Sequence, residues 1–552
     1  MPVLKLNSLH LLFQALEKKE IDLFTSRLII LMRDGDLALP LLRIIQGILK
    51  EVAPLTNSAT FIYALASSVV LMEAPDMTEK RKLAKELIDL TNAPEASSDL
   101  LELVAGAIIN LMLEDELPLE EKKELVTRLH QMTLCRNATS DVLDIYARGL
   151  FNISVDEPNI NGKRAYTHQL QTLALYGKGT VTTRIHAAKA YVNLGCFTHD
   201  EGERVNCLAT LEKLVHKPGT NAELRNIYAK GMFNFIVDDD NQETFRNRYF
   251  QKLKKLAQAP EATWDIRKLY AHSLLFMALY TENIREKRKY VRQIMEMVEM
   301  PGCVPEIFVT AARAVFNHQI DEISLKNKKK AILMLERILK RSGSAPSVLR
   351  EYARSLVNIA TEDQPYEAKR RYSDQLLKLT ETKNPSLDIV LEYAKSLLNL
   401  VLTDESDEQK VKDLTTILSI DQNIHYRKAN LAENTRVNYL CVKAEALMLM
   451  LTMEPNLAER RKILSKIPKV DEIKESDYFK VFVDIFKDTV EDEKDPALKQ
   501  ELREMYDSFV HVFEVSMNNK NLLNILKQVD EKKLDISPNL LKDLVEKMED
   551  EE

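Results

Sequence analysis

Apolar residues recur along this chain of 552 residues with a short period and a long one. The short period is that of an amphipathic helix: in the stretch IVLEYAKSLLNLVL, one face collects the residues Val390, Ala394, Leu397, Leu398 and Val401. The long period is 41 or 42 residues, after which the same arrangement of apolar and polar positions returns. Two helices of about 15 residues and two short loops fill such a period, so the pattern predicts one helical hairpin per unit.

Two series of positions define this repeat. The first helix of each unit carries an asparagine, replaced once by phenylalanine, and the series is Asn110, Asn152, Asn193, Asn234, Phe276, Asn317, Asn358 and Asn399. The second helix carries leucine or isoleucine, at Leu87, Leu129, Leu170, Leu211, Leu253, Ile294, Leu335 and Leu376. Because chance does not keep two series in phase over eight units, the sequence predicts an internal repeat.

Hairpins of this kind bury their apolar faces only when they are stacked on one another. Small residues before each asparagine let neighbouring backbones approach closely. We therefore predict an all-α fold, a right-handed α-α superhelix (α-solenoid) of about 8–9 two-helix repeats with one concave face. The predicted repeat region covers residues 59–420, between an N-terminal helical cap at 1–58 and a C-terminal helical cap or subdomain at 421–552 that ends in an acidic tail.

The composition agrees with a helical protein. Hydrophobic residues make up 45% of the chain and there are only 13 glycines, which favours helix over a large β structure. The 77 basic and 84 acidic residues nearly balance, leaving a net charge of −7. This balance does not suggest a nucleic-acid-binding protein, although it leaves room for a basic stripe on one face.

Other classes of function have little support in the sequence. The five cysteines are widely spaced, without a CxxC motif, so we predict neither a disulfide framework nor a zinc site. Common catalytic and nucleotide-binding motifs do not occur, so we expect no enzyme activity, no catalytic residues, no metal and no cofactor. The chain has neither a run of about 18 apolar residues nor the features of a signal peptide, so we predict a cytoplasmic protein without a membrane span.

The stretches AAKAYVNLG, YARSLVNIA and YAKSLLNLV resemble the last helix of armadillo repeats, whose pattern is roughly A-x-x-A-L-x-N-L-A. The long period also fits, and the two-helix unit leans toward HEAT-like geometry. This resemblance implies an armadillo/HEAT-type repeat protein whose asparagine-bearing helices line a concave groove. It also implies that the asparagines hold the backbone of an extended peptide, and the residues at these positions are Asn152, Asn193, Asn234, Asn317, Asn358 and Asn399.

A basic residue or histidine stands four positions before each of these asparagines or the phenylalanine, where nuclear-import adaptors carry tryptophan. These residues are Arg148, Lys189, Lys230, His272, Arg313, Arg354 and Lys395. Residues four apart share one helix face, so stacked helices would present a stripe of cations and amides. An amide can pair with a peptide backbone, and a cation favours acidic side chains or phosphate. The stripe therefore predicts a scaffold that binds an extended acidic or phosphorylated segment.

Two alternatives remain open at this stage. The asparagines would be structural if they bonded to the adjacent repeat, and the basic residues would be structural if they paired with acidic loop residues. The stripe could also bind a nucleic-acid backbone, since helical solenoids can bind phosphates. The unit with His272 and Phe276 departs from the pattern and is compatible with either an apolar pocket or ordinary packing. Neither the partner nor the oligomeric state follows from the sequence.

Overall fold

The structure is a computed structural model, and it describes nine segments of the chain. These are residues 39–53, 57–93, 96–176, 179–238, 242–362, 365–381, 386–403, 406–420 and 433–513. The acidic tail and most of the predicted N-terminal cap lie outside the described residues. The chain divides into two compact units, unit 1 (Met1–Ser273) and unit 2 (Leu274–Glu552).

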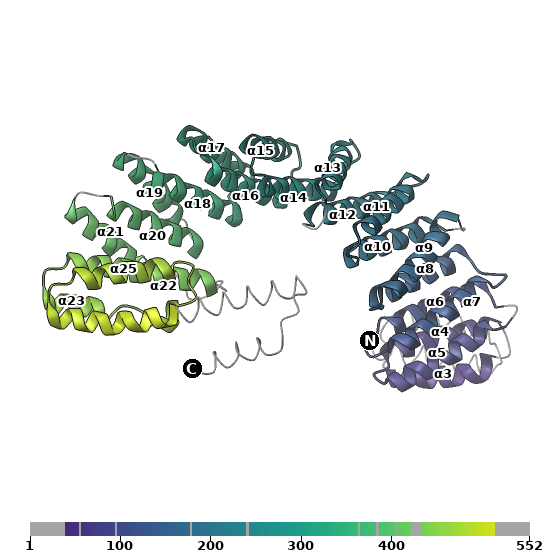
Figure 1. The fold of residues 1–552 in the computed structure, drawn as a ribbon. Coiled ribbons are helices and arrows are strands. Elements are labelled where there is room, and N and C mark those ends of the chain that lie inside the picture. Colours follow the sequence, from purple (N-terminus) through teal and green to yellow (C-terminus); the bar gives the residue numbers. More distant parts are fainter. Residues whose placement is uncertain are drawn as a thin grey trace, which may run out of the picture. The chain divides into compact units, whose positions relative to one another are not determined.

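All elements of the described residues are helices, shown in Figure 1. Those of unit 1 are α3 (Leu39–Val52), α4 (Asn57–Glu73), α5 (Met77–Thr91), α6 (Ser98–Met112), α7 (Leu119–Thr133), α8 (Ser140–Asp156), α9 (Ile160–Tyr176), α10 (Val181–Phe197), α11 (Glu201–His216), α12 (Ala222–Val237) and α13 (Glu243–Gln258). The boundary between the units falls within α14 (Trp264–Tyr280).

Unit 2 continues the same succession of helices. They are α15 (Ile284–Val298), α16 (Pro305–Asp321), α17 (Leu325–Arg341), α18 (Pro346–Glu362), α19 (Tyr366–Thr380), α20 (Leu387–Val401), α21 (Asp407–Ser419), α22 (Glu433–Met453), α23 (Leu457–Leu464), α24 (Val470–Ile473) and α25 (Phe479–Asp492). A further helix covers residues 496–513.

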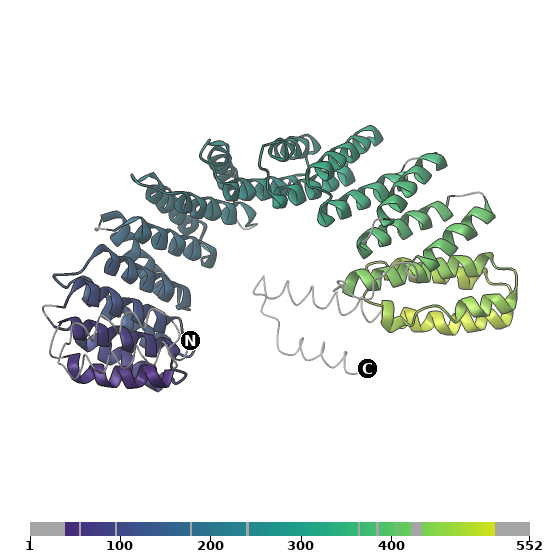
Figure 2. The ribbon, with the colours of Figure 1, turned by 180° about the vertical axis from the view of Figure 1, so that it is seen from behind.

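Within each unit the helices form two layers. Consecutive helices pack as hairpins, and the even-numbered helices also pack directly on one another, from α4 to α12 in unit 1 and from α16 to α22 in unit 2. Figures 1 and 2 show these even-numbered helices side by side from two directions. The odd-numbered helices pack chiefly against even-numbered ones. The expected hairpin repeat is therefore confirmed, and the asparagine-bearing helices of each unit share one layer.

Both sequence series lie in the expected places. The leucine and isoleucine positions are buried in the odd-numbered helices, and the alanines five residues before the asparagines are buried in the even-numbered ones. A small residue is required between the layers at Gly149 and Gly231. A Cβ atom there would lie 2.9 Å from Leu129 Cδ1 or Leu211 Cδ1, closer than such atoms approach.

Hydroxyl side chains start several even-numbered helices and connect them to the preceding repeat. Thr139 and Thr180 are N-caps, since each hydroxyl oxygen accepts backbone N–H groups of the first turn. The same hydroxyls donate to acids on the preceding even-numbered helix, Thr139 to Glu102 and Thr180 to Asp144, each at 2.6 Å. These bonds fix how consecutive hairpins stack.

A third series of positions escaped the sequence analysis. A lysine or arginine at the start of most odd-numbered helices is largely buried, and it pairs with an acid 34 residues later, at the end of the next even-numbered helix. The pairs are Lys80–Glu114, Lys122–Asp156, Arg204–Asp238, Lys287–Asp321 and Lys328–Glu362. Each pair therefore ties the start of an odd-numbered helix to the end of the next even-numbered helix, on the side opposite the loop that connects the two.

In the repeat that contains α9, the buried cation has different partners. Phe197 stands where the acid is expected, and Lys163 Nζ lies 4.7 Å from its ring centroid. The ammonium donates to the carbonyl oxygens of Ser154 and Val155, at 2.9 and 2.8 Å. These carbonyls belong to the last turn of α8, where the helix dipole favours a cation.

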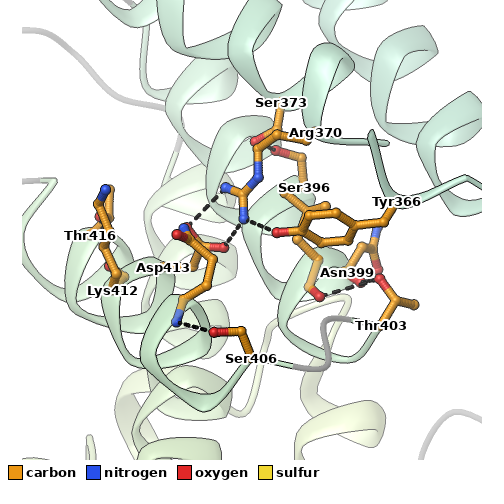
Figure 3. A network of polar contacts seen from close by, with 12 residues as sticks. Tyr366, Arg370, Ser373, Ser396, Asn399, Thr403, Ser406, Lys412, Asp413 and Thr416 are labelled. Carbon is orange, nitrogen blue, oxygen red and sulfur yellow. Dashed lines mark hydrogen bonds and ion pairs between the residues drawn. The ribbon is translucent and has the colours of Figure 1, made fainter. Parts of the chain in front are cut away.

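Ion pairs also join neighbouring odd-numbered helices. In Figure 3, Arg370 of α19 reaches Asp413 of α21 with both terminal nitrogens, at 3.0 and 2.5 Å. The hydroxyl of Tyr366 accepts a further bond from the same guanidinium. Asp413 is buried and the fork is bidentate, so this contact is geometrically specific.

Candidate peptide-binding face

Within each unit, the even-numbered helices carry three aligned rows of residues on one side, which we call the ladder face of that unit. The rows consist of a basic residue, an asparagine four residues later, and a third residue three positions after that, which is apolar except at Thr361. On α8, α10 and α12 the three positions are Arg148, Asn152 and Val155, then Lys189, Asn193 and Cys196, then Lys230, Asn234 and Val237. On α16, α18 and α20 they are Arg313, Asn317 and Ile320, then Arg354, Asn358 and Thr361, then Lys395, Asn399 and the C-cap residue Leu402. Spacings of four and three residues place each set on a single side of its helix.

The basic residues of the ladder face differ in whether they have partners. Lys189, Arg354 and Lys395 form ion pairs with Glu223, Glu351 and Glu392, at 3.0, 3.1 and 2.9 Å. Arg354 also lies 4.4 Å from the ring centroid of Phe316, and Lys395 lies 5.1 Å from that of Tyr478. Internal contacts therefore use these three charges.

Three other cations of this face are exposed and form no ion pair with any described residue. They are Arg148 and Lys230 in unit 1 and Arg313 in unit 2. Burial is the main cause that lowers the pKa of His186 to about 4, and the nearby charges of Lys189 and Arg148 contribute. His186 is therefore neutral at physiological pH, and the face keeps its positive character through the arginines and lysines.

Several asparagines make contacts with the preceding repeat. Asn234 Nδ2 lies 3.0 Å from Cys196 Sγ, and Asn358 Nδ2 lies 3.4 Å from Gln319 Oε1. Asn110, one unit earlier in the series, makes the same kind of contact to Met72 Sδ at 3.4 Å. These bonds show that some asparagines contribute to stacking, as one of the sequence alternatives proposed.

The remaining asparagines have other surroundings. Asn317 Nδ2 donates to the carbonyl oxygen of Arg313 on its own helix, at 2.9 Å. Asn152 Nδ2 is buried and has no hydrogen-bond partner among the described residues. Asn193 and Asn399 are half-buried, and the carbonyl oxygen of Asn399 accepts the hydroxyl of Thr403 in Figure 3. The asparagines of this row therefore do not share one role: some bond within the protein, and a ligand role for the others is a hypothesis.

The divergent repeat, which carries His272 and Phe276, has these residues on α14, the helix within which the boundary between unit 1 and unit 2 falls. His272, in unit 1, is exposed and its ring centroid lies 6.2 Å from that of Phe233. Phe276, in unit 2, is half-buried and stacks on Tyr280 at 5.9 Å. Each aromatic side chain therefore packs against a ring of its own unit.

The sequence analysis missed the apolar row. Its larger members are 45–66% exposed, and they are Leu113, Val155, Leu279, Ile320 and Leu402. The repeat pattern contained this signal, because each of these residues follows the asparagine position, or Phe276 in one repeat, by three residues. Exposed apolar side chains that recur beside a polar row are typical of interaction surfaces.

Other kinds of site are not evident in the described parts of the chain. No group of three or more His, Cys, Asp or Glu side chains there could hold a metal ion. Among the described helices, none combines the length and the hydropathy needed to cross a bilayer. All five cysteines fall within these parts and are unpaired.

The sequence matches no protein-family model and no curated protein sequence. Among solved structures, an engineered protein aligns over 78% of this chain and 98% of its own, with 17% identity and a TM-score of 0.38. Kap121p bound to Nup53p aligns over 92% of this chain with 12% identity and a TM-score of 0.37, and the aligned part covers 56% of Kap121p. Kap121p bound to Ste12p aligns over 85% of this chain and 53% of its own, with 12% identity and a TM-score of 0.35. The architecture follows from the helix packing itself: the described part of the chain is an α-helical repeat protein built of stacked helical hairpins.

Proposed function

We propose that the protein is a non-enzymatic interaction scaffold whose ladder face binds an extended, acidic or phosphorylated segment of a partner protein. The observation that carries this proposal is the difference between the cations of the two layers. Buried lysines and arginines that start the odd-numbered helices are matched by acids within the chain. Arg148, Lys230 and Arg313 are exposed on the ladder face and form no ion pair within the described parts of the chain. A partner segment with negative charge would form ion pairs with these three cations.

The apolar row refines the expected partner. Packed helices in one layer lie about 8–10 Å apart, and an extended chain rises about 3.3 Å per residue. About three partner residues therefore pass each repeat. We expect the bound segment to place an apolar side chain about every third residue, with acidic residues between them. A nucleic-acid backbone would leave Val155, Ile320 and Leu402 without an apolar contact, so it fits this face less well.

The test uses the full chain and fluorescent 12-residue peptides in which two glutamates alternate with one leucine. We expect binding to this peptide and none to the version with lysine in place of glutamate. Lys230→Glu should lower the affinity at least tenfold, because it turns an attractive contact into a repulsive one. The matched control is Lys255→Glu on α13, an exposed lysine of the same unit that lies in the other layer. That variant should change the affinity less than about twofold.

Unit 2 offers an independent pair of variants. Arg313→Glu on α16 changes the ladder face, whereas Arg337→Glu on α17 makes the same exchange at an exposed position of the other layer. We expect only Arg313→Glu to weaken binding, with melting temperatures that stay close to the unmodified protein in both variants. Equal losses in both variants would show a non-specific charge effect. Binding of single-stranded DNA with a steep salt dependence, in preference to the acidic peptide, would support the phosphate-backbone alternative instead.

A further inference from the structure

Unit 1 contains a cavity of about 130 Å³ between α10, α11 and α12. Its inner wall is mostly apolar and is formed by Gly195, Cys207, Leu208, Leu211, Gly231 and Phe235. Cys196 and Asn234 also line it, and both are positions of the ladder face. Because Cys196 is exposed and Asn234 is half-buried, the cavity opens where the apolar and asparagine rows meet.

Gly195 explains why this space is empty. It follows its asparagine by two residues, a position that is buried in the other repeats and occupied there by a side chain. The equivalent residues are Met112, Ser154, Ile236, Ala278, Gln319, Ala360 and Val401. A Cβ atom on Gly195 would meet only Cys207 Cβ, at 3.7 Å, an ordinary contact distance. A larger side chain therefore has room, and the glycine leaves that room free at the cost of helix propensity.

The size and the walls of the cavity indicate what it can hold. An apolar cavity of about 150 Å³ is known to bind a molecule as large as benzene, so about 130 Å³ suits one branched aliphatic or methionine side chain. Arg204 and Asp238 also line the cavity, and their charges neutralise each other in an ion pair at 2.6 Å, in which the arginine is buried and the aspartate half-buried. The recognised group is therefore an uncharged side chain.

The surroundings of the mouth indicate which chain carries that group. Lys230 lies one helical turn before Asn234 on α12, and it is exposed without an ion pair to a described residue. Helix α8, which packs on α10, adds Arg148, for which no ion pair with a described residue exists either. Because these two cations flank the mouth, a ligand whose apolar side chain enters beside Asn234 would bind best with carboxylates on either side of that side chain.

We propose that this cavity is the anchor pocket for the bound segment, and that it takes one leucine, isoleucine or methionine side chain from an extended acidic peptide. The inference rests on the proposed function, because it assumes that such a segment lies along the ladder face. It adds a specific position: one partner residue contributes most of the discrimination, as buried anchors do in other interfaces.

The test compares two peptides and three proteins. The first peptide consists of glutamates and alanines with one central leucine, and the second has alanine in place of that leucine. The unmodified protein should bind the leucine peptide at least tenfold more tightly. In Gly195→Met, which copies Met112 of the equivalent position, this preference should fall below about twofold while binding of the alanine peptide is unchanged. Gly195→Ala is the matched control, since a single Cβ leaves most of the cavity open, and it should keep the preference.

A second measurement does not depend on a variant that folds. Cys196 is exposed at the mouth, whereas burial raises the pKa of the Cys207 thiol to about 12, so iodoacetamide should modify Cys196 far faster. The leucine peptide should slow this modification, read by mass spectrometry, more than the alanine peptide does. If neither peptide binds, the proposed function fails with the pocket. If both bind equally and protect Cys196 equally, the scaffold stands and the pocket is wrong.

Discussion

Replacing Glu445 by glutamine is expected to stabilise unit 2 at pH 8.5 by several kcal/mol and to have little effect at pH 5. Glu445 lies on α22 and is only 7% exposed, and its Oε1 atom has no hydrogen-bond partner among the described residues. Burial raises the pKa of this carboxyl to about 8, although the charge of Lys395 opposes the shift. The side chain is therefore largely protonated at neutral pH, a form that glutamine imitates.

The direction of the pH effect follows from proton linkage. The pKa of Glu445 is raised in the folded protein from an ordinary value of 4.5 to about 8. Between these two values the folded protein holds a proton that the unfolded chain has lost, so stability falls as the pH rises through this window. A pKa shift of this size lowers the free energy of unfolding by ~4–5 kcal/mol once the pH has passed both values. The glutamine variant removes this loss and should show a flatter dependence of stability on pH.

Hydrogen exchange of α22 and α25 at pH 5 and pH 8.5 measures this effect in the region concerned. The control is Glu475→Gln, an exposed glutamate of the same unit, which should alter stability by less than about 0.5 kcal/mol at either pH. If unmodified protein exchanges with the same protection at both pH values, after correction for intrinsic rates, Glu445 ionises normally and the expectation is wrong.

Truncating Leu335 to alanine is expected to destabilise unit 2 by ~2–5 kcal/mol. Leu335 belongs to the leucine series of the sequence and is fully buried on α17, at 0% exposure. The substitution removes buried methyl groups and leaves a cavity that the packed helices on either side can close only in part. Neighbouring α16 and α18 contact α17, so the loss should reach both.

The same helix supplies a control for this substitution. Leu333 lies two residues earlier and is 55% exposed, so Leu333→Ala should cost much less, about 0.5 kcal/mol or below. Denaturant unfolding followed by hydrogen exchange of α16 to α18 separates the two, because repeat arrays can unfold in parts. Similar losses for the two variants would mean that the leucine series does not mark the core.

The sequence by itself determined the helices, the two-helix unit and the core positions. These features follow from local periodicity, since an apolar residue every three or four positions specifies a helix face. The repetition of that pattern at 41 or 42 residues then specifies stacking, because every hairpin needs the same partner surface. Positions such as Leu335 and Ala353 could be assigned to the core without knowing what lies opposite them, and both are buried.

Only the tertiary structure decided which polar residues remain available to a ligand. Lys189 and Lys230 occupy equivalent positions, yet Lys189 pairs with Glu223 on the next even-numbered helix and Lys230 forms no ion pair with a described residue. The cavity beside Gly195 and the protonation of Glu445 likewise depend on side chains from other helices. Periodicity specifies which face a residue occupies, but pairing, empty space and desolvation depend on atoms brought together from tens of residues apart, and the repeat pattern does not encode them.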